Sequence, residues 1–207
     1  MRRGRPTVRW PLWDARANLP DHTCAALAEG RALETPRRRC YTQGLMEDQE
    51  IMREQAEILA SRAYRHQMAG ELGDAIALYR RSIALFPTPE AHTFLGWAYN
   101  LMDRTEEAMA ECEKAIALDP SFGNPYNDIG AYLIELERYE EAIPWLEQAI
   151  NAPRYATPWF AYVNLGRAYE RLGEPYRALA AYDRAQEMAP LYLPAQWAKG
   201  LLLGRLN

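Results

Sequence analysis

Histidine and cysteine, the residues that most often do chemistry, are few in this chain and form no familiar constellation. His22, Cys24 and Cys40 lack the spacing of metal ligands, and the third cysteine, Cys112, stands far from them. The sequence has no glycine-rich phosphate loop, no Ser/His/Asp arrangement and no HExxH pattern. These absences predict a protein with no catalytic residues, no metal and no cofactor.

Charge is distributed unevenly along the 207 residues. Residues 1–44 hold nine arginines against four acidic residues, whereas residues 45–207 hold 15 basic residues against 24 acidic ones. The acidic part argues against a nucleic-acid partner, because phosphates are also negative. Three cysteines give no paired framework, which favours a reducing compartment and hence the cytoplasm. No run of 18 apolar residues is present, so we expect no membrane insertion.

Residues 1–44 are basic and rich in proline and arginine, and they show no helical periodicity apart from one candidate short helix at residues 22–33. We expect this segment to be disordered or loosely ordered. Three other interpretations are open. Translation could begin at Met46 or Met52, the segment could be an arm that binds an acidic partner, or Trp10 to Trp13 could fold back into the protein's own acidic groove.

One sequence layout recurs in the rest of the chain. Residues 108–120 read AMAECEKAIALDP, residues 75–87 and 178–190 repeat the layout, and a looser copy starts at Ala142. In each copy a small residue is followed by a bulky one four positions later and by another small one seven positions later. These three residues lie on one stripe of a helix, and a proline then ends the element. The layout therefore predicts helices that pack closely against one another.

A second signature, Leu-Gly or Ile-Gly, precedes these stretches. It occurs in full or degraded form at Ala63, Gly96, Gly130 and Gly166, and a further glycine follows at Gly200. The successive spacings are 33, 34, 36 and 34 residues. Over about residues 56–207 this pattern resembles the tetratricopeptide repeat family, which is recognised by a period near 34 residues.

The resemblance implies an all-α fold, a right-handed α-solenoid of four helix-turn-helix repeats plus a C-terminal capping helix. Residues 45–207 would form this domain, with a first helix that begins near Leu45. The repeats would span about residues 56–88, 89–122, 123–158 and 159–192, and the capping helix residues 193–206. Helix N-caps are expected at Asp74, Thr88, Asn124 and Thr157, and the last three each precede a proline.

In this family one face of the first helix of each repeat lines a concave groove. Carried over position by position, the resemblance places twelve candidate peptide-binding residues on that face: Tyr64, Gln67, Trp97, Asn100, Asn124, Asn127, Asp128, Phe160, Asn164, Arg167, Glu170 and Trp197. Thr93, Glu135 and Arg171 fall on the same face.

The residue types on this face suit a peptide ligand, and each also has a structural interpretation. Asparagine side chains carry a donor and an acceptor and can hold an extended peptide backbone, while aromatic rings contribute contact area. Equally, Trp97 and Trp197 could pack on neighbouring helices, and Asn127 and Asn164 could bond the backbone of the next repeat.

The cations of this face narrow the choice of ligand. Some tetratricopeptide domains hold a C-terminal carboxylate with several Lys and Arg residues, but only Arg167 and Arg171 lie on this face. Arg167 could instead pair with Asp128 or Glu135. A neutral or basic peptide therefore suits the charge better than an acidic one.

These observations favour a non-catalytic scaffold or adaptor for protein–protein interaction. His66, His92 and Cys112 stand at positions where the family has packing residues, so we expect packing and not catalysis. Two alternatives stay open. The run NDIGAYLIELERYEEAI with the linker APRYATP is similar to the pilotins of type IV pilus biogenesis, which implies a pilus or secretion assembly factor. The chain could also form a homo-oligomer through its stacked ends or its basic arm.

Overall fold

The computed structural model describes residues 36–206, with side chains from residue 46 onward. The chain divides into two compact units, residues 1–40 and residues 41–207. The expected short helix at residues 22–33 and the suggested fold-back of Trp10 to Trp13 lie outside the described residues.

The described residues form nine α-helices and no named strand, which confirms the all-α prediction. In chain order they are α1 (Pro36–Met68), α2 (Leu72–Leu85), α3 (Pro89–Asn100), α4 (Thr105–Leu118), α5 (Asn124–Glu135), α6 (Tyr139–Asn151), α7 (Trp159–Arg171), α8 (Pro175–Met188) and α9 (Leu193–Leu206). None of these described helices is both long and apolar enough to cross a bilayer.

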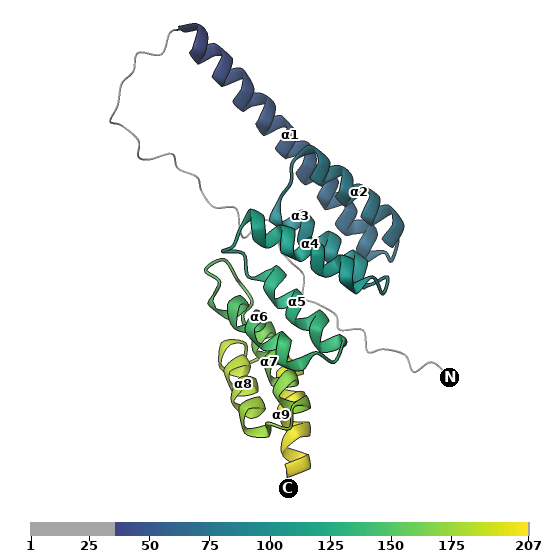
Figure 1. Ribbon diagram of the computed structural model, residues 1–207, viewed down its shortest axis with the longest axis vertical. Coiled ribbons are helices and arrows are strands. Elements are labelled where there is room, and N and C mark those ends of the chain that lie inside the picture. The colour runs from purple at the N-terminus through teal and green to yellow at the C-terminus, as the bar shows by residue number, and fades with distance from the viewer. Residues whose placement is uncertain (1–35, 207) are drawn as a thin grey trace. The chain divides into compact units, whose positions relative to one another are not determined.

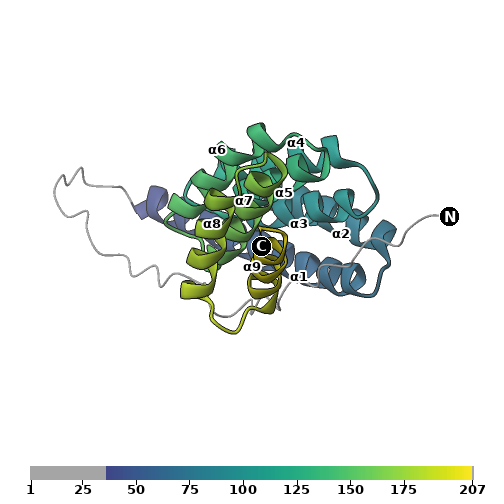
Figure 2. The ribbon, with the colours of Figure 1, turned by 90° about the horizontal axis from the view of Figure 1, so that it is seen from below.

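Successive helices pack as hairpins that stack in chain order (Figures 1 and 2). We call α1, α3, α5, α7 and α9 the A helices and α2, α4, α6 and α8 the B helices. α3 packs on α4, α5 on α6 and α7 on α8, and neighbouring A helices also meet, from α3 through α5 and α7 to α9. α9 follows the last hairpin and packs on both of its helices, as expected of a capping helix.

The small–bulky–small stripe of each B helix is buried, as the sequence layout predicts. The four stripes are Ala75–Tyr79–Ser82, Ala108–Cys112–Ala115, Ala142–Leu146–Ala149 and Ala178–Tyr182–Ala185, and every member is at most 1% exposed. Each stripe faces the A helix that precedes it, so the two helices of a hairpin bury it between them.

The repeat glycines lie against these stripes. A Cβ atom at Gly130 would lie 2.5 Å from Leu146 Cδ2, and one at Gly166 would lie 2.6 Å from Tyr182 Cδ1. At Gly96 it would lie 2.8 Å from the carbonyl oxygen of Ala108. Each glycine is therefore required by the close approach of its A helix to the following B helix.

α1 begins at Pro36, nine residues before the expected start near Leu45. Pro36 occupies the first helical position, where a missing N–H is harmless, so it starts this helix and does not break it. Residues 46–55 of α1 are exposed, and Ala56 is the first buried side chain of this helix among the described residues.

Of the four expected N-caps only Thr88 acts as predicted, because its Oγ1 accepts a hydrogen bond from the Ala91 N–H at 3.1 Å. Asp74 is not a cap. The chain leaves α1 through Gly70 at φ +81° and re-enters a helix at Leu72, so Asp74 lies in the first turn of α2, where its charge favours the helix dipole.

The other two cap predictions were also wrong. Gly123 is the N-cap of α5, because its carbonyl accepts the Asn127 N–H at 3.2 Å, and Asn124 is already helical. α7 begins at Trp159 with Pro158 before it, so Thr157 lies outside the helix.

The linker between α6 and α7 forms the only β-bridge of the described chain. The Arg154 N–H donates to the Ser121 carbonyl at 2.9 Å, and the Gly123 N–H donates to the Arg154 carbonyl at 3.1 Å. The Arg154 guanidinium lies 4.5 Å from the Phe122 ring, donates to Asp119 Oδ2 at 2.6 Å and also pairs with Glu90. The long linker after α6 thereby contacts both the start of α3 and the loop between α4 and α5.

Candidate binding face

The predicted groove residues lie on the A helices, and the contact between α5 and α7 holds a connected row of them. Asn164 Nδ2 donates to Asn127 Oδ1 at 3.1 Å, and both residues are buried, at 5% and 2% exposure. Arg167 Nη1 donates to Asn164 Oδ1 at 3.2 Å, and Asn127 Nδ2 donates to Asp128 Oδ1 at 3.3 Å. The two asparagines thus form a hydrogen bond between their side chains, in place of the bonds to the next repeat's backbone that the sequence left open.

Asp128 stands at the end of this row and is partly buried. Burial raises its pKa to about 7, and the Asn127 hydrogen bond opposes that rise only in part. No Lys or Arg among residues 46–206 forms an ion pair with its carboxylate. The hydroxyl of Tyr132, on the next turn of α5, is buried without a hydrogen bond. Burial and the charge of Asp128 both raise the Tyr132 pKa.

Polar side chains also join the A helices on either side of α5 and α7. Asn100 Nδ2 donates to Glu135 Oε2 at 3.0 Å, which links α3 to α5. Glu170 accepts the Tyr182 hydroxyl at 3.0 Å and pairs with Arg205, which links α7 to α8 and α9. These predicted groove residues therefore hold neighbouring helices together.

The first two repeats supply an aromatic row. Tyr64 of α1 and Phe94 of α3 have ring centroids 5.4 Å apart, and Phe94 and Trp97 follow at 6.5 Å. Gln67 is buried, and its Oε1 accepts the Tyr79 hydroxyl at 2.9 Å, so it supports the hairpin from inside. Phe94 was not among the predicted residues, although it lies between two of them.

The remaining predicted residues occupy separate places. Phe160 is buried edge-on against Tyr192 at 5.1 Å, which makes it a core residue at the start of α7. Asn124 is half-buried at the first turn of α5. Trp197 is 66% exposed on α9.

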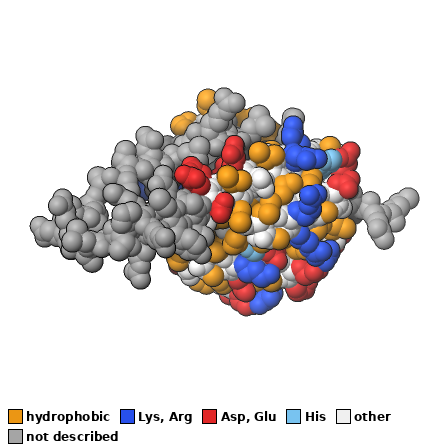
Figure 3. Space-filling model, turned by 90° about the horizontal axis from the view of Figure 1, so that it is seen from above, with side chains coloured by type: hydrophobic (Ala, Val, Ile, Leu, Met, Phe, Trp, Pro, Cys, Tyr) orange, Lys and Arg blue, Asp and Glu red, His pale blue; other side chains and the backbone are white. Residues whose placement is uncertain are grey.

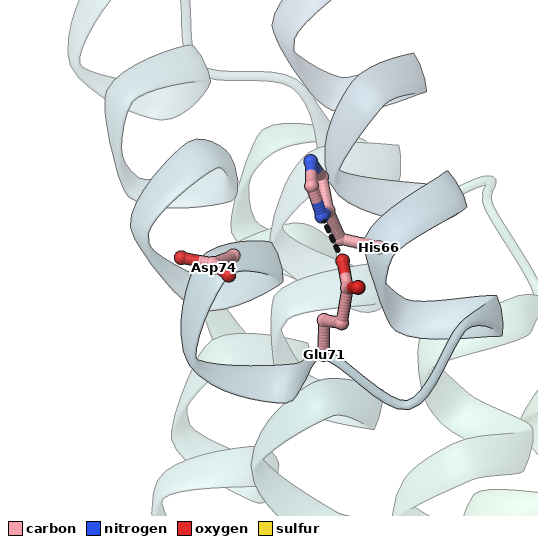
Figure 4. A group of neighbouring side chains, drawn as sticks. All are labelled: His66, Glu71 and Asp74. Atoms are coloured by element: carbon pink, nitrogen blue, oxygen red, sulfur yellow. Dashed lines mark hydrogen bonds and ion pairs between the residues drawn. The ribbon is translucent and has the colours of Figure 1, made fainter.

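Each of the two histidines in the described residues contacts one glutamate carboxylate. His92 is buried, and its Nδ1 lies 2.6 Å from Glu111 Oε2, a contact that lowers the Glu111 pKa against the opposing effect of burial. His66 Nδ1 lies 2.5 Å from Glu71 Oε2 across the turn between α1 and α2 (Figure 4).

Asp74 lies near the His66–Glu71 pair, and the ligand atoms of these three residues are all within 4.8 Å of one another. These types could bind a divalent cation. However, Arg62 and Arg65 line the same surface depression as His66 and Glu71, and their charge opposes a cation. We therefore interpret the group as an ion pair that closes the turn.

Models of the tetratricopeptide repeat match the chain over residues 54–121, 124–154 and 159–192. Subunit 6 of the anaphase-promoting complex from Arabidopsis thaliana is 30% identical over 122 residues, 56% of this chain and 22% of that protein. Tetratricopeptide repeat protein 21B from Mus musculus is 28% identical over 127 residues, 61% of this chain and 9% of that protein. The chain thus spans less than a quarter of the length of either relative.

Solved structures share the fold. PilF of Pseudomonas aeruginosa superposes with a TM-score of 0.70 at 21% identity, covering 74% of this chain and 70% of PilF. PilW, a type IV pilus biogenesis factor, gives 0.65 at 22% identity over 71% of this chain and 70% of PilW. YrrB, described as having an unusual peptide-binding site, gives 0.56 at 22% identity over 80% of this chain and 82% of YrrB. At these identities the likeness concerns the fold alone.

Proposed function

We propose, from the premise that the chain belongs to the tetratricopeptide repeat family, that it is a non-catalytic adaptor. Repeats of this family mediate protein–protein interactions. The adaptor would hold a segment of a partner protein along the A-helix face from Trp97 through Asp128 to Arg167, and the segment would carry a basic side chain.

The observation that supports this proposal is the partly buried Asp128 carboxylate without a cationic partner. A charge in such a place is costly, which is why its pKa is raised to about 7. A Lys or Arg side chain of a bound segment would replace the missing counter-charge, lower that pKa and form a desolvated ion pair. The excess of acidic residues over residues 45–207 would attract such a segment from solution.

The neighbouring side chains suit the rest of an extended segment. Arg167 is exposed and can offer its free N–H groups to backbone carbonyls. Trp97 is half-buried beside Phe94, and its exposed part can add contact area to a bound segment. Asn127 and Asn164 we assign to holding α5 and α7 together, because their hydrogen bonds are made inside the protein.

A peptide array tests the proposal. Neutral peptides are displayed beside the same peptides with one Lys or Arg, and the full chain is compared with Asp128→Asn. We expect basic peptides to bind preferentially, and Asp128→Asn to weaken their binding by about tenfold or more. Glu113→Gln, a change at an exposed acid on α4, is the matched control and should leave binding unchanged. Equal binding of neutral and basic peptides would reject the proposal.

A role in assembling a pilus or secretion system is a second proposal. The superposition on PilF and PilW favours it, as does the linker of residues 152–158 that bridges to residues 121–123. Cell fractionation separates the two. An adaptor of the cytoplasm stays with the soluble fraction, whereas an envelope assembly factor sediments with membranes.

A further inference from the structure

α9 has one buried side and one open apolar side. Ala195 and Leu202 are buried and belong to the same core as α7 and α8. On the opposite side of the helix Leu193, Trp197 and Leu201 recur every four residues and are 50%, 66% and 71% exposed. An exposed apolar stripe of this kind marks an interaction surface on a folded protein, so it calls for a partner.

Two glycines lie within the same stripe, at Gly200 and Gly204. A Cβ atom at either would meet nothing within 4 Å, so they leave open space between the exposed side chains. Glycine inside a helix is unfavourable by about 1 kcal/mol relative to alanine. We call the surface over Gly200 and Gly204 the glycine notch.

The earlier repeats show what such a notch receives. In each of them the residue sixteen positions after the glycine lies against it, and the pairs are Gly96 with Cys112, Gly130 with Leu146 and Gly166 with Tyr182. Gly200 has the repeat position of these glycines, and no described side chain fills it. The glycine notch thus continues an interface that the fold makes three times, in which a bulky side chain of a second helix packs on the glycine.

We propose that the glycine notch receives α9 of a second copy of this chain, in a twofold symmetric, antiparallel pair of helices. In one antiparallel register Trp197 lies opposite Gly204 of the partner subunit, and Leu201 lies opposite Gly200 of the partner subunit. Trp197 and Leu201 then each meet a glycine, and the match is reciprocal, as a twofold interface requires.

Charge agrees with this pairing. α9 contains no acidic residue, and its two cations lie off the stripe, where Lys199 pairs with Asp183 at 2.5 Å and Arg205 pairs with Glu170. No like charges are therefore buried face to face, and the dipoles of the antiparallel helices attract.

The other apolar end of the stack is less suited to the glycine notch. Seen from above, where Figure 1 places α1, apolar side chains are mixed with charged ones of both signs (Figure 3). The exposed Ile51 and Ile58 of α1 stand among the acids Glu50, Glu54 and Glu57. Docking of α1 on α9 would moreover be heterologous and would give open chains of unlimited length.

Light scattering on the full chain over a concentration series tests the proposal. We expect a dimer, and we expect Gly200→Leu/Gly204→Leu to raise the dimer dissociation constant by about tenfold or more, because the notch is filled. Circular dichroism should show these variants folded, since the space around both glycines is open. Leu118→Glu, at an exposed leucine of α4, is the matched control and should leave the dimer unchanged.

A wild-type monomer at every concentration, or a dimer that the notch variants do not weaken, would overturn the proposal. Cysteine cross-linking tests the register. Trp197→Cys mixed with Gly204→Cys should form a disulfide between copies, mapped by mass spectrometry. Cross-links of Trp197→Cys to residues of α1 would show head-to-tail chains and reject the twofold pair. Asp128→Asn should leave the molar mass measured by light scattering unchanged. A failure of the dimer proposal can therefore be distinguished from a failure of the proposed peptide site.

Discussion

The hairpin α7/α8 and the helix α9 carry the same repeat glycine in two different surroundings. Gly166 lies under the Tyr182 ring, so close that a Cβ atom there would overlap it, whereas Gly200 faces open space. The local sequence of an A helix is thus one half of an interface, and the residue sixteen positions later supplies the other half. The comparison predicts opposite responses to the same substitution, and it can be tested from the filled side and from the open side.

The largest effect on stability is expected from removing the Tyr182 side chain that packs over Gly166. Tyr182 is fully buried and its hydroxyl donates to Glu170, so Tyr182→Ala leaves a cavity over Gly166 and removes one hydrogen bond from Glu170, whose ion pair with Arg205 remains. We expect the free energy of unfolding to fall by about 3–5 kcal/mol, measured by urea denaturation. Tyr176→Ala is the control, because Tyr176 is 82% exposed on the same helix, and it should change the value by less than about 0.5 kcal/mol. Equal losses for the two variants would show that the contact between Tyr182 and Gly166 adds no stability beyond that of an exposed tyrosine.

The two regions also differ in charge. The exposed stripe of α9 contains no charged residue, whereas α5 inside the stack carries the partly buried Asp128. Its pKa is raised from the ordinary 3.8 to about 7. The folded state therefore keeps a proton that the unfolded state releases, so between about pH 4 and pH 7 stability falls as the pH rises. Asp128→Asn should remove this fall, and the variant should gain roughly 2–4 kcal/mol over the wild type at about pH 8 but little at about pH 4.

Denaturation of both proteins across this pH range, with Glu113→Gln as an exposed control, measures the effect. A gain that is equal at both ends of the range would mean that the Asp128 charge is not destabilised by burial. The same raised pKa makes basic-peptide binding weaken from about pH 8 to about pH 6, because the protonated carboxyl no longer attracts a cation.

The fold was predictable because its signal is a spacing repeated over most of the chain. Glycines near a period of 34 residues, each followed sixteen positions later by a bulky residue, mark the two contacting faces of a hairpin in the sequence itself. The start of α1 was not predictable in the same way. Pro36 is compatible with a broken helix and with the first position of a new one, and the local sequence does not distinguish them.

The candidate site was predictable as a face but not as a set of contacts. Asn127 stands three positions before its repeat glycine and Asn164 stands two positions before its own. The two residues therefore do not correspond, and only the packing of α5 on α7 shows that they meet. Likewise Phe160 and Gln67 have groove positions by analogy, yet both are buried within the stack.

A third test adds a single methyl group at Gly166, where Tyr182 already fills the space. In Gly166→Ala the new Cβ would lie within 3 Å of the Tyr182 ring, which must move although it is fully buried. We expect a loss of about 1–3 kcal/mol in the free energy of unfolding, as is typical of overpacked cores. Thermal or urea unfolding measures it, and a variant as stable as the wild type would show that the α7/α8 contact is loose.

The smallest and most discriminating effect is expected on the open side. In dilute solution, where the chain is monomeric, Gly200→Ala should raise the free energy of unfolding by about 0.5–1 kcal/mol, because alanine favours the helix and its methyl group meets nothing. At high concentration the sign should reverse, since the methyl group then weakens a dimer that stabilises the fold by mass action. Unfolding curves at several protein concentrations measure both limits. A stabilisation that is the same at every concentration would still agree with the different packing of Gly166 and Gly200. It would, however, contradict the proposal that a second copy binds at the glycine notch.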